Sequence, residues 1–216
     1  MSGTDPGRPY VLGVDLDGVC GDYTDAFRSV VATELGVAEE SLPLVRSWDF
    51  REWGLSVDQF EHLHQLAVVE HRILRSMPVI GEAAEALWRL SDIGIWIRVI
   101  THRLYVNWTH ATAIADTVDW LDRARIPYRD ICFLGAKPEV EADLYIDDGP
   151  HNVEALRASG NRVIVFDAPY NRHLAGPRAD GWLACEQLVL ADAAEHGFEL
   201  QIQLPGLEAG TDRLQS

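Results

Sequence analysis

Two aspartates, Asp15 and Asp17, stand one residue apart at the end of a short apolar run, and Gly18 follows them. A strand buried on both faces reads as such a run, and ligands of open α/β sheets lie at the carboxyl ends of the strands. Paired carboxylates can hold Mg²⁺ or exchange protons, and a glycine lets the backbone approach a ligand closely. The segment therefore favours a metal-assisted phosphate site. An acidic turn after a strand is the alternative.

Further polar residues follow other apolar runs in the same way. The second run is followed by Thr101 and His102. Lys137 lies in a loop near the third run, and the acids Asp147 and Asp148 follow the fourth. In a parallel sheet the carboxyl ends of the strands share one edge, so these groups would converge there. Each alone is explained as a helix cap, a solvated lysine or a turn former, but their common position favours function.

The elements that must position these side chains alternate along the chain. Apolar, β-branched runs predict strands at residues 11–14, 95–100, 131–134, 144–146 and 162–166. Helical patterns between or after them lie at 81–93, 107–124, 152–159 and 183–194. Such alternation produces right-handed crossovers and a parallel sheet with helices on both faces. We expect an α/β fold with a doubly wound parallel sheet.

The first crossover is much longer than a simple connection requires. It contains amphipathic helical patterns at 22–35 and 57–76, with an aromatic stretch between them. An insertion at this place would lie above the strand ends, as a small α-helical cap over the site. We therefore expect a core of residues 1–18 and 81–203, a cap of residues 19–80, and a disordered tail of residues 204–216.

The composition limits the choice of partner. The chain has 216 residues and a net charge of −16, from 18 basic and 34 acidic residues. This charge repels a polyanion, so a nucleic-acid polymer is not an expected partner, whereas a small phosphorylated molecule is compatible if a cation offsets the field. We find no export signal and no run long enough to span a membrane, so we expect no membrane partner. Three separated cysteines suit a reducing, cytoplasmic location, and a homodimer is compatible with the sequence.

The polar segments together resemble the four ordered motifs of the haloacid dehalogenase-type phosphatases. The matching residues are Asp15-x-Asp17-Gly18-Val19, Ile100-Thr101, Lys137 and Ile146-Asp147-Asp148. A cap inserted between the first two motifs is typical of one subgroup. More narrowly, the chain is similar to the 5′(3′)-deoxyribonucleotidase family in its tryptophan-bearing cap and in residues 142–148 and 166–171. It departs from the pattern after Thr101, where His102 and Arg103 replace the small residues expected, and this bears on substrate identity.

The resemblance implies a Mg²⁺-dependent hydrolase of phosphate monoesters, with nucleoside monophosphates as substrates. It makes Asp15 the nucleophile that forms an aspartyl-phosphate, and Asp17 the general acid and base. Mg²⁺ would be held by Asp15, the backbone carbonyl of Asp17, and Asp148. Asp147 would orient a metal-bound water or Lys137, although the sequence does not decide which of the two adjacent acids contacts the metal.

The resemblance also implies a phosphate site. Thr101 and Lys137 would bind the free phosphate oxygens, assisted by backbone N–H groups around Gly18. His102 and Arg103 are candidates to bind the phosphate or the ribose, or alternatively pack against the next helix. Asn152 could brace the metal side, but helix N-capping is the reading we favour for it.

Aromatic residues of the inserted segment are candidates to contact a nucleobase. They are Tyr23, Trp48, Phe50 and Trp53, and for each the alternative is packing within the core of the cap. The same pattern would also suit a phosphatase for another small ester, such as a sugar or cofactor phosphate. A non-catalytic nucleotide-binding protein of this fold is a third reading, and the retention of both Asp15 and Asp17 argues against it.

Overall fold

The computed structural model describes residues 8–104, 109–134 and 136–199. Within them, one sheet has the strand order β3-β2-β1-β4-β5-β6, and every neighbouring pair is parallel. The strands are β1 (Val11–Val14), β2 (Trp96–Thr101), β3 (Asp130–Phe133), β4 (Leu144–Asp147), β5 (Val163–Phe166) and β6 (Arg178–Ala179). The predicted parallel α/β sheet is confirmed. The two-residue strand β6 was not predicted, because no apolar run marks it in the sequence.

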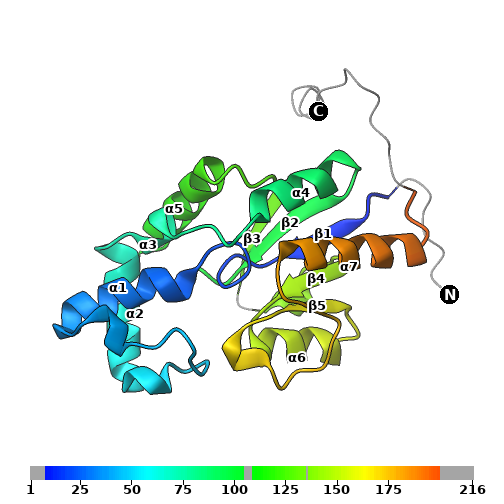
Figure 1. Ribbon diagram of the computed structural model, residues 1–216. Coiled ribbons are helices and arrows are strands. Elements are labelled where there is room, and N and C mark those ends of the chain that lie inside the picture. Colours follow the sequence, from blue (N-terminus) through cyan, green and yellow to red (C-terminus); the bar gives the residue numbers. More distant parts are fainter. Residues whose placement is uncertain (1–7, 105–108, 135, 200–216) are drawn as a thin grey trace.

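Helices cover both faces of this sheet (Figure 1). Side chains alternate between the faces, so in β5 Ile164 and Phe166 belong to one apolar cluster and Val163 and Val165 to another. The first cluster includes α4 (Ala83–Asp92), α5 (His110–Arg123) and α7 (Trp182–Glu195), whereas the second includes α6 (Pro150–Ala158). Burial on both sides explains why the strands read as continuous apolar runs.

The inserted segment forms a helical cap beyond the carboxyl ends of the strands (Figure 1, blue to cyan). Its helices are α1 (Tyr23–Leu35), α2 (Val57–Val69) and α3 (Ile73–Ser76), with short 3₁₀ turns at Glu39–Ser41 and Arg51–Trp53. The single helix predicted over 57–76 is therefore wrong. The helix is interrupted between Val69, where α2 ends, and Ile73, where α3 begins. In this interval Arg72 has a left-handed φ of 55°, and its side chain pairs with Asp116 of α5.

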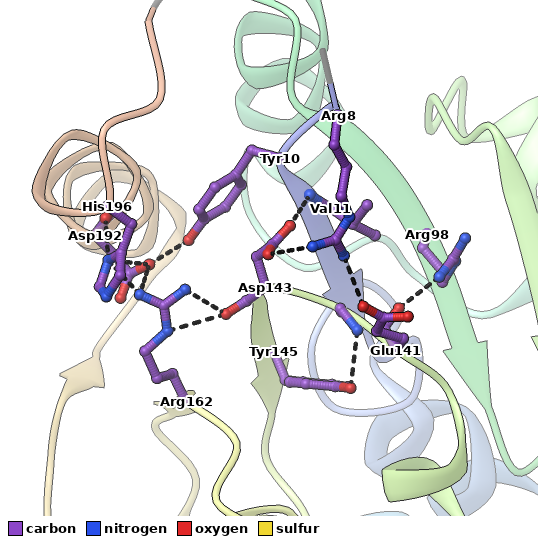
Figure 2. A network of polar contacts seen from close by, with 11 residues as sticks. Arg8, Tyr10, Val11, Arg98, Glu141, Asp143, Tyr145, Arg162, Asp192 and His196 are labelled. Atoms are coloured by element: carbon purple, nitrogen blue, oxygen red, sulfur yellow. Dashed lines mark hydrogen bonds and ion pairs between the residues drawn. The ribbon is translucent and has the colours of Figure 1, made fainter. Parts of the chain in front are cut away.

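A polar network at the opposite edge of the sheet ties the last helix to the strands (Figure 2). The hydroxyl of Tyr10 donates to Asp192 of α7, and Arg162 pairs with the same carboxylate at 3.0 Å. Arg162 also donates to the carbonyl of Asp143, whose carboxylate accepts the N–H of Val11 at 2.7 Å. This network connects α7 to the amino ends of β1 and β4. It therefore stabilises the positions of the two strands whose carboxyl ends carry the candidate acids.

Some predictions fall partly outside the described residues. The predicted tail at 204–216 lies wholly outside them, and the start of the helix predicted at 107 does so as well. The helix itself is seen from His110 as α5. None of the helices that the structure describes has both the length and the apolar character needed to cross a bilayer.

Candidate active site

The strand order places the candidate acids side by side. The chain runs from β1 outward through β2 and β3, and then returns to the other side of β1 for β4. Ligand sites of open α/β sheets lie at such a reversal of strand order, outside the carboxyl ends. The backbone N–H of Asp15 donates to the carbonyl of Ile146 at 3.1 Å, which aligns the ends of β1 and β4. The first and the last motif therefore meet at this crevice.

Three carboxylates gather there. Asp15, Asp147 and Asp148 each offer an oxygen, and these oxygens lie within 4.8 Å of one another. All three residues are buried. Burial, together with the neighbouring acids, raises the pKa of Asp15 to about 7 and that of Asp148 well above its ordinary value. The group therefore resists full ionisation without a further cation.

Lys137 is the cation that the structure brings to these acids. Its Nζ lies 2.8 Å from Oδ1 of Asp15 and 2.6 Å from Oδ2 of Asp147. Burial alone would lower the pKa of this ammonium group, but the two carboxylates outweigh burial and raise it. Lys137 is thus charged, and among the described residues it is the cation that forms ion pairs with two of these three acids. Asp147 therefore contacts Lys137, whereas its role in orienting Lys137 or a metal-bound water stays a prediction.

Asp148 is held by two residues that follow β5, and the sequence did not predict this contact. The hydroxyl of Tyr170 donates to Oδ2 of Asp148, and the side-chain amide of Asn171 donates to its carbonyl oxygen at 2.8 Å. A Cβ atom at Gly18 would lie only 2.0 Å from the same Oδ2, and Gly18 has a left-handed φ of 84°. Only glycine fits this position, because the backbone here touches the carboxylate.

Two buried polar atoms beside the acids have no hydrogen-bond partner among the described residues. They are Oγ1 of Thr101, at the end of β2, and Nε2 of the adjacent His102. Burial and the nearby Lys137 lower the pKa of His102, so this imidazole is neutral at pH 7. A buried hydroxyl without a partner costs about 1–3 kcal/mol, and such groups are therefore expected to meet a ligand.

The second acid of the first motif has a different partner. Arg103 places its Nη2 2.8 Å from Oδ1 of Asp17, and its side chain is only 1% exposed. Substrate contact by Arg103 remains a prediction, since what the structure shows is a guanidinium bound to Asp17. The sequence did not reveal this pair, because 86 residues separate its members.

The expected capping role of Asn152 is wrong. Helix α6 begins at Pro150, with Gly149 at the N-cap position, so Asn152 lies inside the first turn. Its side-chain amide donates to Oδ1 of Asp147 at 3.2 Å, and the N–H of Gly149 donates to the same oxygen at 2.9 Å. Asn152 thus fixes one of the acids.

A cavity of about 970 Å³ lies between the acids and the cap. On the core side it is lined by Asp15, Asp17, Gly18, Asp148 and Tyr170, and on the cap side by Tyr23, Trp48, Phe50, Phe60 and His64. His102 and Arg103 also line it, whereas the buried Thr101 and Lys137 are not among the lining residues. The volume is sufficient for a ligand with one polar end and one aromatic end.

The aromatic residues of the cap divide into two groups: those that line the cavity and those that pack inside the cap. Trp48 is 44% exposed and meets the ring of Tyr170 edge-on at 5.3 Å. Tyr23 lines the cavity and hydrogen-bonds Nδ1 of His64 at 2.7 Å. Trp53 is not among the lining residues. It is 6% exposed and donates to the carbonyl of Pro43 at 2.9 Å, which favours the core alternative for this residue.

Phe50 belongs to both groups. Its ring packs against Phe27 and Trp53, at centroid distances of 5.4 and 4.7 Å, and is 4% exposed. It nevertheless lines the cavity, with the guanidinium of Arg46 3.6 Å above its ring centre. Substrate contact by the cap residues stays a prediction, and so does a homodimer.

Comparison with known proteins places the chain in a family. A model of the family described as 5′ nucleotidase, deoxy (Pyrimidine), cytosolic type C protein matches residues 9–195. A protein of Chlorobaculum tepidum named "Putative 5′(3′)-deoxyribonucleotidase" is 43% identical over 173 residues, which are 80% of this chain and 86% of that protein. The 5′(3′)-deoxyribonucleotidase of Bacillus subtilis is 24% identical over 171 residues, covering 76% and 88% of the two chains.

Solved structures agree on the fold. A haloacid dehalogenase-like hydrolase from Streptococcus pneumoniae has a TM-score of 0.57 at 16% identity, covering 85% of this chain and 97% of that one. A haloacid dehalogenase-superfamily hydrolase from Geobacter sulfurreducens has a TM-score of 0.53 at 15% identity, covering 84% and 100%. The chain is therefore a phosphatase with a haloacid dehalogenase-like fold, and it belongs to the cytosolic type C family of deoxy (pyrimidine) 5′ nucleotidases.

Proposed function

We propose that this enzyme is a Mg²⁺-dependent 5′(3′)-deoxyribonucleotidase, which hydrolyses deoxynucleoside monophosphates through an aspartyl-phosphate on Asp15. The observation that carries the proposal is the buried cluster of Asp15, Asp147 and Asp148, which Lys137 neutralises only in part, at the polar end of a cavity with aromatic walls. The names of the relatives from Chlorobaculum tepidum and Bacillus subtilis support the choice of substrate.

The donor set suits a magnesium ion. Mg²⁺ prefers oxygen ligands and is commonly bound through one or two carboxylates, and here burial raises the pKa of both Asp15 and Asp148 in the absence of metal. Asp15 and Asp148 would hold the ion with the backbone carbonyl of Asp17. A bound ion would offset the charge of the phosphate as the nucleophile approaches. Asp147 is engaged by Lys137, Gly149 and Asn152, which supports an orienting role for it.

The reaction uses two acids of the first motif. The carboxylate of Asp15 attacks phosphorus, and the bond from phosphorus to the ester oxygen breaks. Asp17 enters this step protonated, donates its proton to the departing oxygen so that an alcohol leaves, and becomes a carboxylate. Asp17 then takes a proton from the water that attacks the aspartyl-phosphate, which frees Asp15 and releases phosphate. Lys137 and the hydroxyl of Thr101 would bind phosphate oxygens, which would give Oγ1 of Thr101 its missing partner.

The cap supports the choice of a nucleotide. Trp48 offers a half-exposed indole at the cavity, and Tyr23 and Phe50 line the same wall. Stacking of a base on an aromatic side chain contributes about 1–3 kcal/mol. A sugar phosphate offers no such face, so we expect the wall to favour nucleotides.

A panel of phosphate monoesters tests the proposal. Release of phosphate is measured with Mg²⁺ and with a chelator, for deoxynucleoside and ribonucleoside monophosphates, sugar phosphates and cofactor phosphates. We expect deoxynucleotides to give the highest kcat/KM, and the chelator to abolish turnover. Asp15→Asn should be inactive, whereas Asp119→Asn, at a surface ion pair with Arg75, is the matched control and should be unaffected.

Equal rates for sugar phosphates and deoxynucleotides would contradict the substrate assignment. A non-catalytic nucleotide-binding protein would bind nucleotides without turnover, and beryllium fluoride would not form an adduct on Asp15. Full activity of Asp15→Asn would contradict the mechanism.

A further inference from the structure

We propose that Arg103 is a positioning residue, which fixes the carboxylate of Asp17 in the direction needed for proton transfer. This inference rests on the proposed function, because that function makes Asp17 the proton donor and acceptor. It concerns a position at which the chain departs from the small residues expected after Thr101.

The contact between the two side chains is two-pronged. Nη2 of Arg103 lies 2.8 Å from Oδ1 of Asp17, and Nε lies 3.2 Å from Oδ1 and 3.1 Å from Oδ2. Hydrogen bonds from two guanidinium nitrogens that reach both oxygens restrict the orientation of a carboxylate as well as its distance. Asp17 is 30% exposed through its side chain and lines the cavity, whereas the side chain of Arg103 is 1% exposed. The buried partner therefore orients the exposed one.

Arg103 is itself held by other elements. Its Nη1 donates to Oγ1 of Thr117 at 3.3 Å, and its guanidinium lies 5.1 Å from the ring centre of Trp120, both in α5. Its Nη2 lies 3.5 Å from the sulfur of Met77, just after α3 of the cap. The carbonyl of Met77 accepts the indole N–H of Trp120 at 2.8 Å. The direction of Asp17 is thus set by a core helix and by the segment through which the cap returns to the core.

This support matters because Asp17 must act twice on different oxygens. A proton is transferred efficiently only along a well-aligned hydrogen bond, and small misplacements of a catalytic group reduce rates strongly. An unrestrained aspartate in the wall of a large cavity would sample several rotamers. Among the described residues, the hydrogen bonds that Arg103 donates go to Asp17, Thr117 and Met77, and of these three Asp17 is the one that takes part in the proposed reaction.

The experiment compares two esters that differ in their need for a proton. A deoxynucleoside monophosphate releases a poor leaving group that must be protonated, whereas p-nitrophenyl phosphate releases a stable phenolate. The first step is followed by single-turnover release of the alcohol or phenol, for wild type, Arg103→Met, Arg103→Lys and Asp17→Asn. Arg72→Met is the matched control, because it also removes an arginine from an ion pair with an aspartate. The partner of Arg72 is Asp116 of α5, which has no role in the proposed reaction.

We expect Arg103→Met to slow the step for the nucleotide by about tenfold or more, and for p-nitrophenyl phosphate by less than about threefold. KM should stay within about threefold of wild type. Arg103→Lys keeps the positive charge but not the planar guanidinium group, so its rate of nucleotide cleavage should lie between those of wild type and Arg103→Met. It also provides the test if Arg103→Met does not fold. The double variant with Asp17→Asn should be no slower than Asp17→Asn alone, and Arg72→Met should affect both esters equally.

Equal losses on both esters, or additive losses in the double variant, would overturn the inference. A large rise in KM with kcat unchanged would do the same and make Arg103 a substrate-binding residue. All these outcomes leave the proposed function intact. Turnover by Asp15→Asn, measured in the same series, would instead remove the proposed function and this inference with it.

Discussion

Replacing Asp15 by asparagine should stop turnover and also make the metal-free protein more stable. Burial raises the pKa of this carboxyl from 3.8 to about 7, against the attraction of Lys137. Near pH 7.5 the folded state must therefore keep Asp15 ionised at a cost of about 4 kcal/mol, calculated from the pKa difference. A neutral amide of the same shape avoids this cost.

The dependence on pH has a definite sign. Because the pKa is raised in the folded state, folded Asp15 binds more protons than unfolded Asp15 between pH 3.8 and about 7. The metal-free wild type thus loses stability as pH rises through this window. The advantage of Asp15→Asn should be about 4 kcal/mol near pH 7.5 but only about 2 kcal/mol near pH 5.

Urea unfolding with a chelator present measures this difference at the two pH values. In a protein of this size 1 kcal/mol shifts the melting temperature by about 2–4 °C, so thermal unfolding should show a rise of about 10 °C near pH 7.5. Asp119→Asn is the surface control and should change stability by less than about 0.5 kcal/mol. Equal or lower stability of Asp15→Asn near pH 7.5 would refute the reasoning, since it would mean that Lys137 fully compensates this carboxylate.

Further predictions concern other residues of the site. Asp17→Asn should have the opposite effect on stability, a loss of about 3–5 kcal/mol by urea unfolding, because it leaves Arg103 buried without an anion. Mg²⁺ should raise the melting temperature of wild type more near pH 7.5 than near pH 5, because protons compete for the acids whose pKa burial raises. Gly18→Ala should weaken Mg²⁺ binding at least about tenfold by calorimetry, since its methyl group would displace Asp148. Trp48→Ala should raise KM for a deoxynucleotide by about 5–150-fold with little change in stability, whereas Trp53→Ala should cost about 3–5 kcal/mol of stability.

The sequence was sufficient to predict five of the six strands of the described sheet and the main polar groups of the site. Strands buried on both faces must be apolar throughout, so they are visible as runs, and the polar residue that ends each run is visible too. Parallel pairing then places all of these ends at one edge without any knowledge of distant contacts. Asp15, Asp148 and Lys137 were found in this way, and the structure brings them together.

The tertiary structure alone decided what each side chain contacts. Arg103 binds Asp17 across 86 positions of the chain, and Tyr170 binds Asp148 across 22, and no local pattern encodes either pair. Trp48 and Trp53 are five residues apart and chemically identical, yet one lines the cavity and the other is packed inside the cap. Periodicity reports which residues are apolar, whereas the direction of a side chain depends on how separate elements pack. The physical reason is that local propensity acts over one or two turns, while the site is assembled by contacts across the whole fold.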